Sequence, residues 1–80
     1  MQEKELKRKI KKWTKLEDEA RSVRRRMADW DFINNQPPKI REALKYYIET
    51  GDIRRASYLA GLDIDDFREM LRKAKVPVVV

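Results

Sequence analysis

The sequence predicts an all-α protein: a long N-terminal amphipathic, coiled-coil-like helix, then a three-helix, helix-turn-helix-like unit and a short extended C-terminal tail. Three observations predict this class. Residues 1–33 contain no Gly and no Pro and are rich in residues that helices tolerate well. Residues 39–75 carry apolar side chains at helical spacing, interrupted by two glycines. With 80 residues, the chain has room for one small domain at most.

Residues 1–33 are expected to form one basic amphipathic helix. Apolar residues recur there at steps of three or four positions, which predicts a single apolar stripe along the helix. The other positions are charged or polar, so the stripe needs a partner helix, and we expect a homo-oligomer. The predicted oligomer interface consists of Leu6, Ile10, Trp13, Leu16, Val23, Met27 and Trp30. For the two tryptophans, packing inside the chain's own core is the alternative.

Residues 34–38 form the predicted break, because Pro37 and Pro38 stop the first helix and can begin the next. Residues 39–80 are expected to form the compact unit. Gly51 and Gly61 fit the left-handed position that ends many helices. Asp52 and Asp63 are predicted N-caps.

The inward faces of the two short helices follow from the same spacing. We expect Ile53, Ala56, Leu59 and Ala60 to face inward from the first, and Phe67, Met70, Leu71 and Ala74 from the second. Residues 76–80 hold one proline and four valines, which favours an extended tail, either an edge strand or a strap packed on the core.

Composition excludes several kinds of chemistry. The chain has no Cys and no His, so disulfides, zinc fingers and thiol or imidazole catalysis are ruled out. Two glycines are too few for a Gly-rich phosphate loop. We therefore expect no enzyme activity, catalytic residue, metal, cofactor or small-molecule substrate. No long apolar stretch predicts a membrane span, and the chain is expected to be cytoplasmic. High charge without Cys is typical of thermophile proteins.

The basic residues predict contact with nucleic acid. The net charge is +6; residues 1–33 hold 11 basic and 7 acidic residues, and residues 34–80 hold 9 and 7. Clustered cations can neutralise phosphates without reading sequence. The candidate nucleic-acid-binding residues are Lys7, Arg8, Lys11, Lys12, Lys15, Arg24, Arg25, Arg68 and Arg72. The alternative is the solvated exterior of a coiled coil, which charge runs on helices usually are.

Residues 56–70 have the spacing of a helix-turn-helix. Small residues at Ala56, Ser57 and Ala60 allow two helices to cross closely, and Gly61 permits a tight turn. A DNA reader is one interpretation, and an ordinary helical hairpin is the other. The acids Asp63, Asp65 and Asp66 disfavour base reading, because DNA phosphates repel them.

The C-terminal half also resembles a known group of proteins. The run Arg55–Asp63, with Phe67, Leu71 and the tail Val76–Val78, is similar to a small prokaryotic family of antitoxin-like proteins. The resemblance covers residues 40–80 and implies a helix-turn-helix-like unit, no catalysis and a cognate toxin as a possible protein partner. The first half departs from the family pattern.

These observations lead to one expected function and one alternative. The first is an oligomeric, antitoxin-like, non-catalytic regulatory protein that binds DNA or a protein partner. The alternative is a structural coiled-coil adaptor with no role at nucleic acids.

Overall fold

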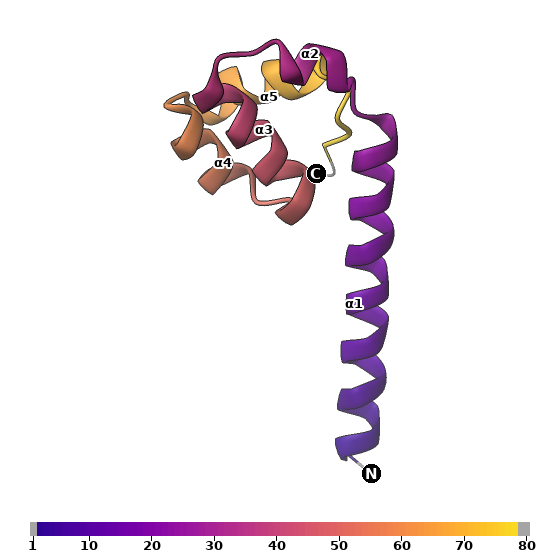
Figure 1. Cartoon of the computed structure of the whole chain (residues 1–80). Helices are drawn as coiled ribbons and strands as arrows, with labels where there is room; N and C mark the ends of the chain where they lie inside the picture. Colours follow the sequence, from indigo (N-terminus) through magenta and orange to yellow (C-terminus); the bar gives the residue numbers. More distant parts are fainter. Residues whose placement is uncertain (1, 79–80) are drawn as a thin grey trace.

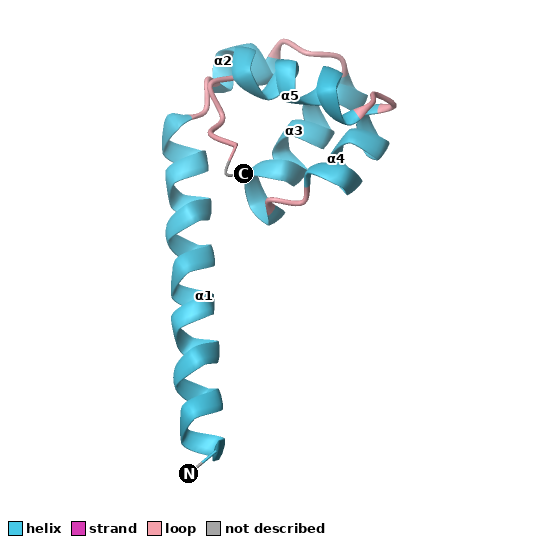
Figure 2. Ribbon diagram, turned by 180° about the vertical axis from the view of Figure 1, so that it is seen from behind, coloured by secondary structure: helices cyan, strands magenta, loops and turns pink. Residues whose placement is uncertain are grey.

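A computed structural model describes the backbone of residues 2–78 and the side chains of residues 15–78. These residues form five α-helices and no strand, which confirms the all-α prediction (Figure 2). The helices are α1 (Gln2–Met27), α2 (Trp30–Asn34), α3 (Pro38–Thr50), α4 (Ile53–Ala60) and α5 (Ile64–Lys73).

The first helix is shorter than the sequence indicated, since α1 ends at Met27 and does not reach residue 33. Asp29 breaks it: its backbone is extended, and its carboxylate accepts a hydrogen bond from the Phe32 amide at 3.1 Å. The Asp29 amide itself donates to the Ala74 carbonyl at 2.7 Å, which ties the break to the end of α5. The chain therefore turns into α2, whose Ile33 is fully buried.

Helices α3 and α4 begin and end close to the residues that the sequence predicts, and α5 begins there, while α5 ends at Lys73. Pro38 is the first residue of α3, a position that suits proline because its missing amide would have no partner there. Gly51 and Gly61 both adopt left-handed backbone, with φ of 71° and 70°. Asp52 and Asp63 cap α4 and α5, each accepting a hydrogen bond from a backbone amide three residues on, at 3.1 and 2.8 Å.

A three-residue turn, residues 61–63, joins α4 to α5. The Gly61 amide donates to the Tyr58 carbonyl and the Leu62 amide to the Ser57 carbonyl, both at 3.0 Å. This pair of bonds is the Schellman arrangement, and it satisfies two carbonyls that would otherwise lack partners at the helix end. The small buried residues Ala56, Ser57 and Ala60 let α4 approach its neighbours closely.

The core lies between α2, α3, α4 and α5. The rings of Tyr47 and Phe67 meet edge to face, with centroids 6.4 Å apart, and join α3 to α5. The buried apolar residues are Ala28, Ile33, Ala43, Leu44, Tyr47, Ile48, Ala56, Ala60, Phe67, Leu71, Ala74 and Val76.

The extended tail packs on this core, as predicted. Lys75 adopts a positive φ of 57°, and the Val76 amide donates to the Leu71 carbonyl at 2.9 Å, which ends α5. Val76 is buried and Val78 is half-buried against the core. Val79 and Val80, which the prediction also covered, lie outside the described residues.

The molecule is elongated because α1 projects from the compact group of the other helices (Figure 1). The principal extents are 51, 23 and 19 Å. Only the C-terminal part of α1 lies beside α3, and the rest extends away from the body. No helix among the described residues is long and apolar enough to cross a membrane.

Candidate functional site

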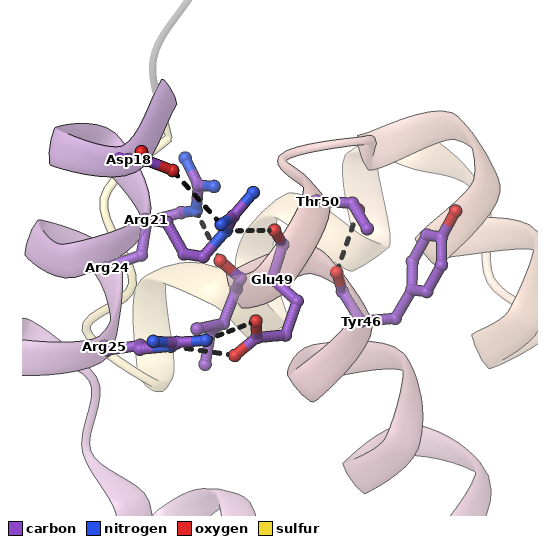
Figure 3. A network of polar contacts seen from close by, with 8 residues as sticks. Asp18, Arg21, Arg24, Arg25, Tyr46, Glu49 and Thr50 are labelled. Atoms are coloured by element: carbon purple, nitrogen blue, oxygen red, sulfur yellow. Dashed lines mark hydrogen bonds and ion pairs between the residues drawn. The ribbon is translucent and has the colours of Figure 1, made fainter. Parts of the chain in front are cut away.

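Three arginines of α1 donate hydrogen bonds to the C-terminal end of α3 (Figure 3). Arg21 Nε donates to the Glu49 carbonyl at 2.8 Å, and Arg24 Nε donates to the Ile48 carbonyl at 2.9 Å. Arg25 makes two hydrogen bonds to the Glu49 carboxylate, at 2.8 and 2.5 Å. We call Arg21, Arg24 and Arg25 the arginine clamp. Arg24 and Arg25 follow Arg21 by three and four residues, so the three side chains lie within about 100° of one another around α1.

The clamp acts on groups that need partners. The last carbonyls of a helix have no amide donor inside the helix, and they form the negative end of its dipole. Because Gly51 ends α3 in left-handed backbone, its own amide satisfies the Tyr47 carbonyl at 2.7 Å. The two carbonyls that follow Tyr47 accept from the clamp. α1 thus caps α3 from outside and is fixed in orientation near its own C-terminal end.

Arg24 was expected to bind nucleic acid, and the structure places it in the interior. Its residue exposure is 8%, and its guanidinium carbon lies 5.8 Å from the centroid of the Tyr47 ring. The guanidinium also rests beside Gly51, where an added Cβ would lie 3.5 Å from its terminal nitrogens. A buried cation in contact with a carbonyl and an aromatic face is a packing residue. We therefore remove Arg24 from the set of phosphate contacts.

Arg25 stays at the surface but is paired. About half of the Arg25 and Glu49 side chains is exposed to solvent. The hydrogen bond from Arg25 holds the pKa of Glu49 below its ordinary value, and the same bond raises the pKa of Arg25. Arg25 can reach a phosphate only by leaving this partner.

The ion pair between Arg25 and Glu49 predicts that the stability of the fold depends on pH. Because the folded state lowers the pKa of Glu49, its ionised form stabilises folding above the unfolded pKa, and this stabilisation disappears as pH falls through the folded pKa. We expect this contribution to the free energy of unfolding to be small, since solvent screens an exposed pair. Urea unfolding of wild type and Glu49→Gln at pH 7 and at acidic pH measures it. The difference between the two proteins should shrink in acid; an equal difference at both values would contradict the assignment.

The apolar stripe on α1 is uncovered where the structure describes its side chains. Leu16 and Met27 are each 54% exposed, and Val23 is half-buried. At about 100° per residue, these side chains lie more than 90° around the helix from the middle of the clamp. The body of the protein therefore occupies one side of α1 and leaves the stripe open.

Trp30 does not continue the stripe, because it belongs to α2. Its indole Nε1 donates to the Arg25 carbonyl at 2.9 Å, so the ring closes the end of α1. The residue remains 38% exposed. The side chains of the other predicted interface residues, Leu6, Ile10 and Trp13, lie outside the described residues.

The remaining basic candidates have different surroundings. Lys15 is exposed on the flank of the stripe opposite the clamp. It lines a shallow depression along α1 together with Asp18, Glu19, Ser22, Val23 and Arg26, so two carboxylates lie beside the two cations. Arg26 is also exposed, and the sequence prediction did not include it. The side chains of Lys7, Arg8, Lys11 and Lys12 lie outside the described residues.

Arg68 and Arg72 are brought together on α5. They line a groove of about 310 Å³ with Val76 and Val78 of the tail. Arg72 is held by two hydrogen bonds to Glu69, at 3.0 and 2.6 Å. Arg68 has no ion pair among residues 15–78.

One exposed surface was missed by the sequence analysis. Leu59 was predicted to face inward, yet it is 42% exposed, and Ser57 takes the buried position in its place. Tyr58, the residue before Leu59, is 83% exposed. An eight-residue helix gives few turns of periodicity, so the spacing could not fix its rotation. Arg54 and Arg55 are exposed beside these two residues.

Comparison of the chain with models of protein families, with curated proteins and with solved structures finds no match. The resemblance to antitoxin-like proteins therefore stays a prediction from residues 40–80.

Proposed function

We propose that the protein is a non-catalytic regulatory protein, antitoxin-like in its C-terminal half, that assembles through α1 and contacts nucleic acid through basic side chains. The observation that carries the proposal is the uncovered apolar stripe on a helix whose orientation the arginine clamp fixes. Leu16 and Met27 each leave about half of their surface in water. A second copy of α1 would bury them, and a chain of this size gains stability from such burial.

Basic side chains remain accessible beside the seam, by which we mean two copies of the α1 stripe packed on each other. Lys15 and Arg26 lie on the flank of the stripe away from the body, so pairing through the stripe leaves both in solvent. Two copies then double the positive charge along one assembly. Such a surface binds phosphates by counterion release and carries little sequence information.

The α4–α5 pair supports a helix-turn-helix as part of the proposal. Its short helices, three-residue turn and buried small residues have the proportions of that motif. Asp65 and Asp66, however, are exposed in the first turn of α5, where a base-reading helix enters the groove. We therefore assign the pair to phosphate contact through Arg68 and not to base reading.

Self-association gives the first prediction. Replacing Leu16 and Val23 with Asp should give a smaller species in light scattering behind gel filtration, because charges in the seam lose their solvation. Ser22→Asp, on a different face of α1, is the control and should leave the size unchanged. A compact monomer for the wild type at high concentration would contradict the prediction.

Nucleic-acid binding gives the second prediction. Binding of a short DNA duplex should weaken steeply with salt, and log affinity should fall linearly with log salt concentration. Removing Lys7, Arg8, Lys11 and Lys12 together should reduce the affinity and the salt slope more than Arg68→Ala does. The reverse ranking, with base-pair discrimination lost in Arg68→Ala, would restore α5 as the reader.

The exposed acids of α5 favour one second candidate, a structural coiled-coil adaptor. An adaptor would keep the α1 seam and make no use of nucleic acid. Salt-dependent retention on immobilised duplex DNA separates the two functions, since only the regulatory protein is retained at low salt.

A further inference from the structure

The outer face of α4 carries a surface that neither the fold nor the proposed function uses. It consists of Arg54, Arg55, Tyr58 and Leu59, which we call the α4 patch. These positions are spaced i, i+1, i+4 and i+5, so they share one side of the helix. The opposite side holds the buried residues Ala56, Ser57 and Ala60.

The apolar side chains of the patch do not pack against the core of the described chain. Tyr58 is 83% exposed, the largest exposure of any large hydrophobic residue in the described part, and Leu59 is 42% exposed. Neither belongs to the residues packed against the core. Exposed aromatic residues next to arginine are the composition of interface hot spots.

The charged part of the patch indicates that its binding partner is acidic. Within residues 15–78, neither Arg54 nor Arg55 has a carboxylate within ion-pair distance, whereas Arg21, Arg25, Arg41 and Arg72 all do. The nearest acid in sequence, Asp52, is used as the N-cap of α4. At the other end of the helix the Lys39 ammonium lies beside Gly61, which adds a third cation.

The patch is also rigid. Asp52 fixes the start of α4 through the Arg55 amide, and the two hydrogen bonds of the turn at Gly61 and Leu62 fix its end. A surface held in this way loses little conformational entropy when it is covered.

We infer that the α4 patch binds an acidic amphipathic segment of a partner protein. Its apolar side chains cover Tyr58 and Leu59, and its carboxylates pair with Arg54 and Arg55. The exposed leucine favours a protein over a DNA duplex, since the outside of a duplex presents mainly charged phosphates. This inference does not rest on the α1 seam or on nucleic-acid binding.

The test uses the full-length chain labelled with ¹⁵N and titrated with a synthetic helical peptide of Glu and Leu. A second peptide with Gln in place of Glu is the uncharged control ligand. Amide shifts should be confined to α4 and the residues beside it, and the Gln peptide should bind about tenfold more weakly. The variant R54E/R55E should lose about tenfold or more in affinity, and Y58A should lose a similar amount.

The control variant K15E/R26E makes the same change in net charge on α1 and should bind the Glu peptide as the wild type does. Equal weakening by the two double variants, or shifts centred on α1 or α5, would overturn the inference. So would a short DNA duplex that shifts the α4 amides and loses affinity in R54E/R55E. Loss of duplex binding in K15E/R26E alone reports on the proposed nucleic-acid function and leaves the α4 patch intact. Circular dichroism establishes that each variant is folded.

Discussion

Phe67→Ala is expected to remove a large share of the free energy of unfolding of the protein. The Phe67 side chain is fully buried, and its ring packs edge to face on Tyr47. Truncating a buried Phe costs about 3–5 kcal/mol. A chain of 80 residues has about 4–12 kcal/mol of total stability at 0.05–0.15 kcal/mol per residue. One substitution thus removes a large share of it.

Thermal unfolding followed by circular dichroism measures this effect. At about 4–8 °C per kcal/mol for a domain of this size, the Tm should fall by roughly 12 °C or more. Tyr58→Ala is the matched control, because it removes an aromatic ring that is 83% exposed, and its Tm should stay close to that of wild type. Equal shifts in the two variants would mean that α5 does not supply the core.

Arg24→Met is expected to weaken the attachment of α1 to the body. Methionine keeps part of the packing volume but removes the donor to the Ile48 carbonyl and the cation on the Tyr47 ring. A hydrogen bond from a charged group that satisfies a buried carbonyl is worth about 1.5–3 kcal/mol. The Tm should therefore fall by roughly 6 °C or more at the same conversion.

The control for this variant is Arg26→Met, which makes the same change at an exposed position two residues on. Limited proteolysis supplies a second readout, since a detached α1 exposes cleavage sites between Arg21 and Asp29. Arg24→Met should be cut there faster than Arg26→Met. Equal cleavage and equal Tm in both variants would show that Arg24 does not hold α1.

Local signals in the sequence predicted much of the fold. Pro38, the two left-handed glycines and the two Asp caps set the bounds of α3 and α4 and the start of α5, because each acts through its own backbone. The packed tail followed from its valines. The break at Asp29 could not be predicted in this way. Its decisive contact is with the Ala74 carbonyl, 45 positions along the chain, and residues 1–33 offered no Gly or Pro to mark it.

In the candidate site too, features set by local sequence could be predicted and features set by distant contacts could not. The α1 stripe was visible as spacing, and Leu16 and Met27 are exposed as a partner surface requires. The role of Arg24 was hidden, because a basic residue in a basic run gives no sign that a distant helix end will bury it. Leu59 was predicted to face inward and does not, because α4 has too few turns for its spacing to fix the rotation of the helix.

The central claim is that a second copy of the chain covers the stripe of α1, and a distance between copies tests it most directly. The chain has no cysteine, so a single Ser22→Cys accepts one nitroxide label on α1, outside the stripe but on the helix that would pair with its copy. Packed helices lie about 8–10 Å apart between axes. Pulsed electron resonance should therefore give a short, narrow distance between copies for Ser22→Cys, and a longer, broader one for the control Lys73→Cys on α5. No dipolar signal between copies at Ser22, or a shorter distance at Lys73, would contradict the claim.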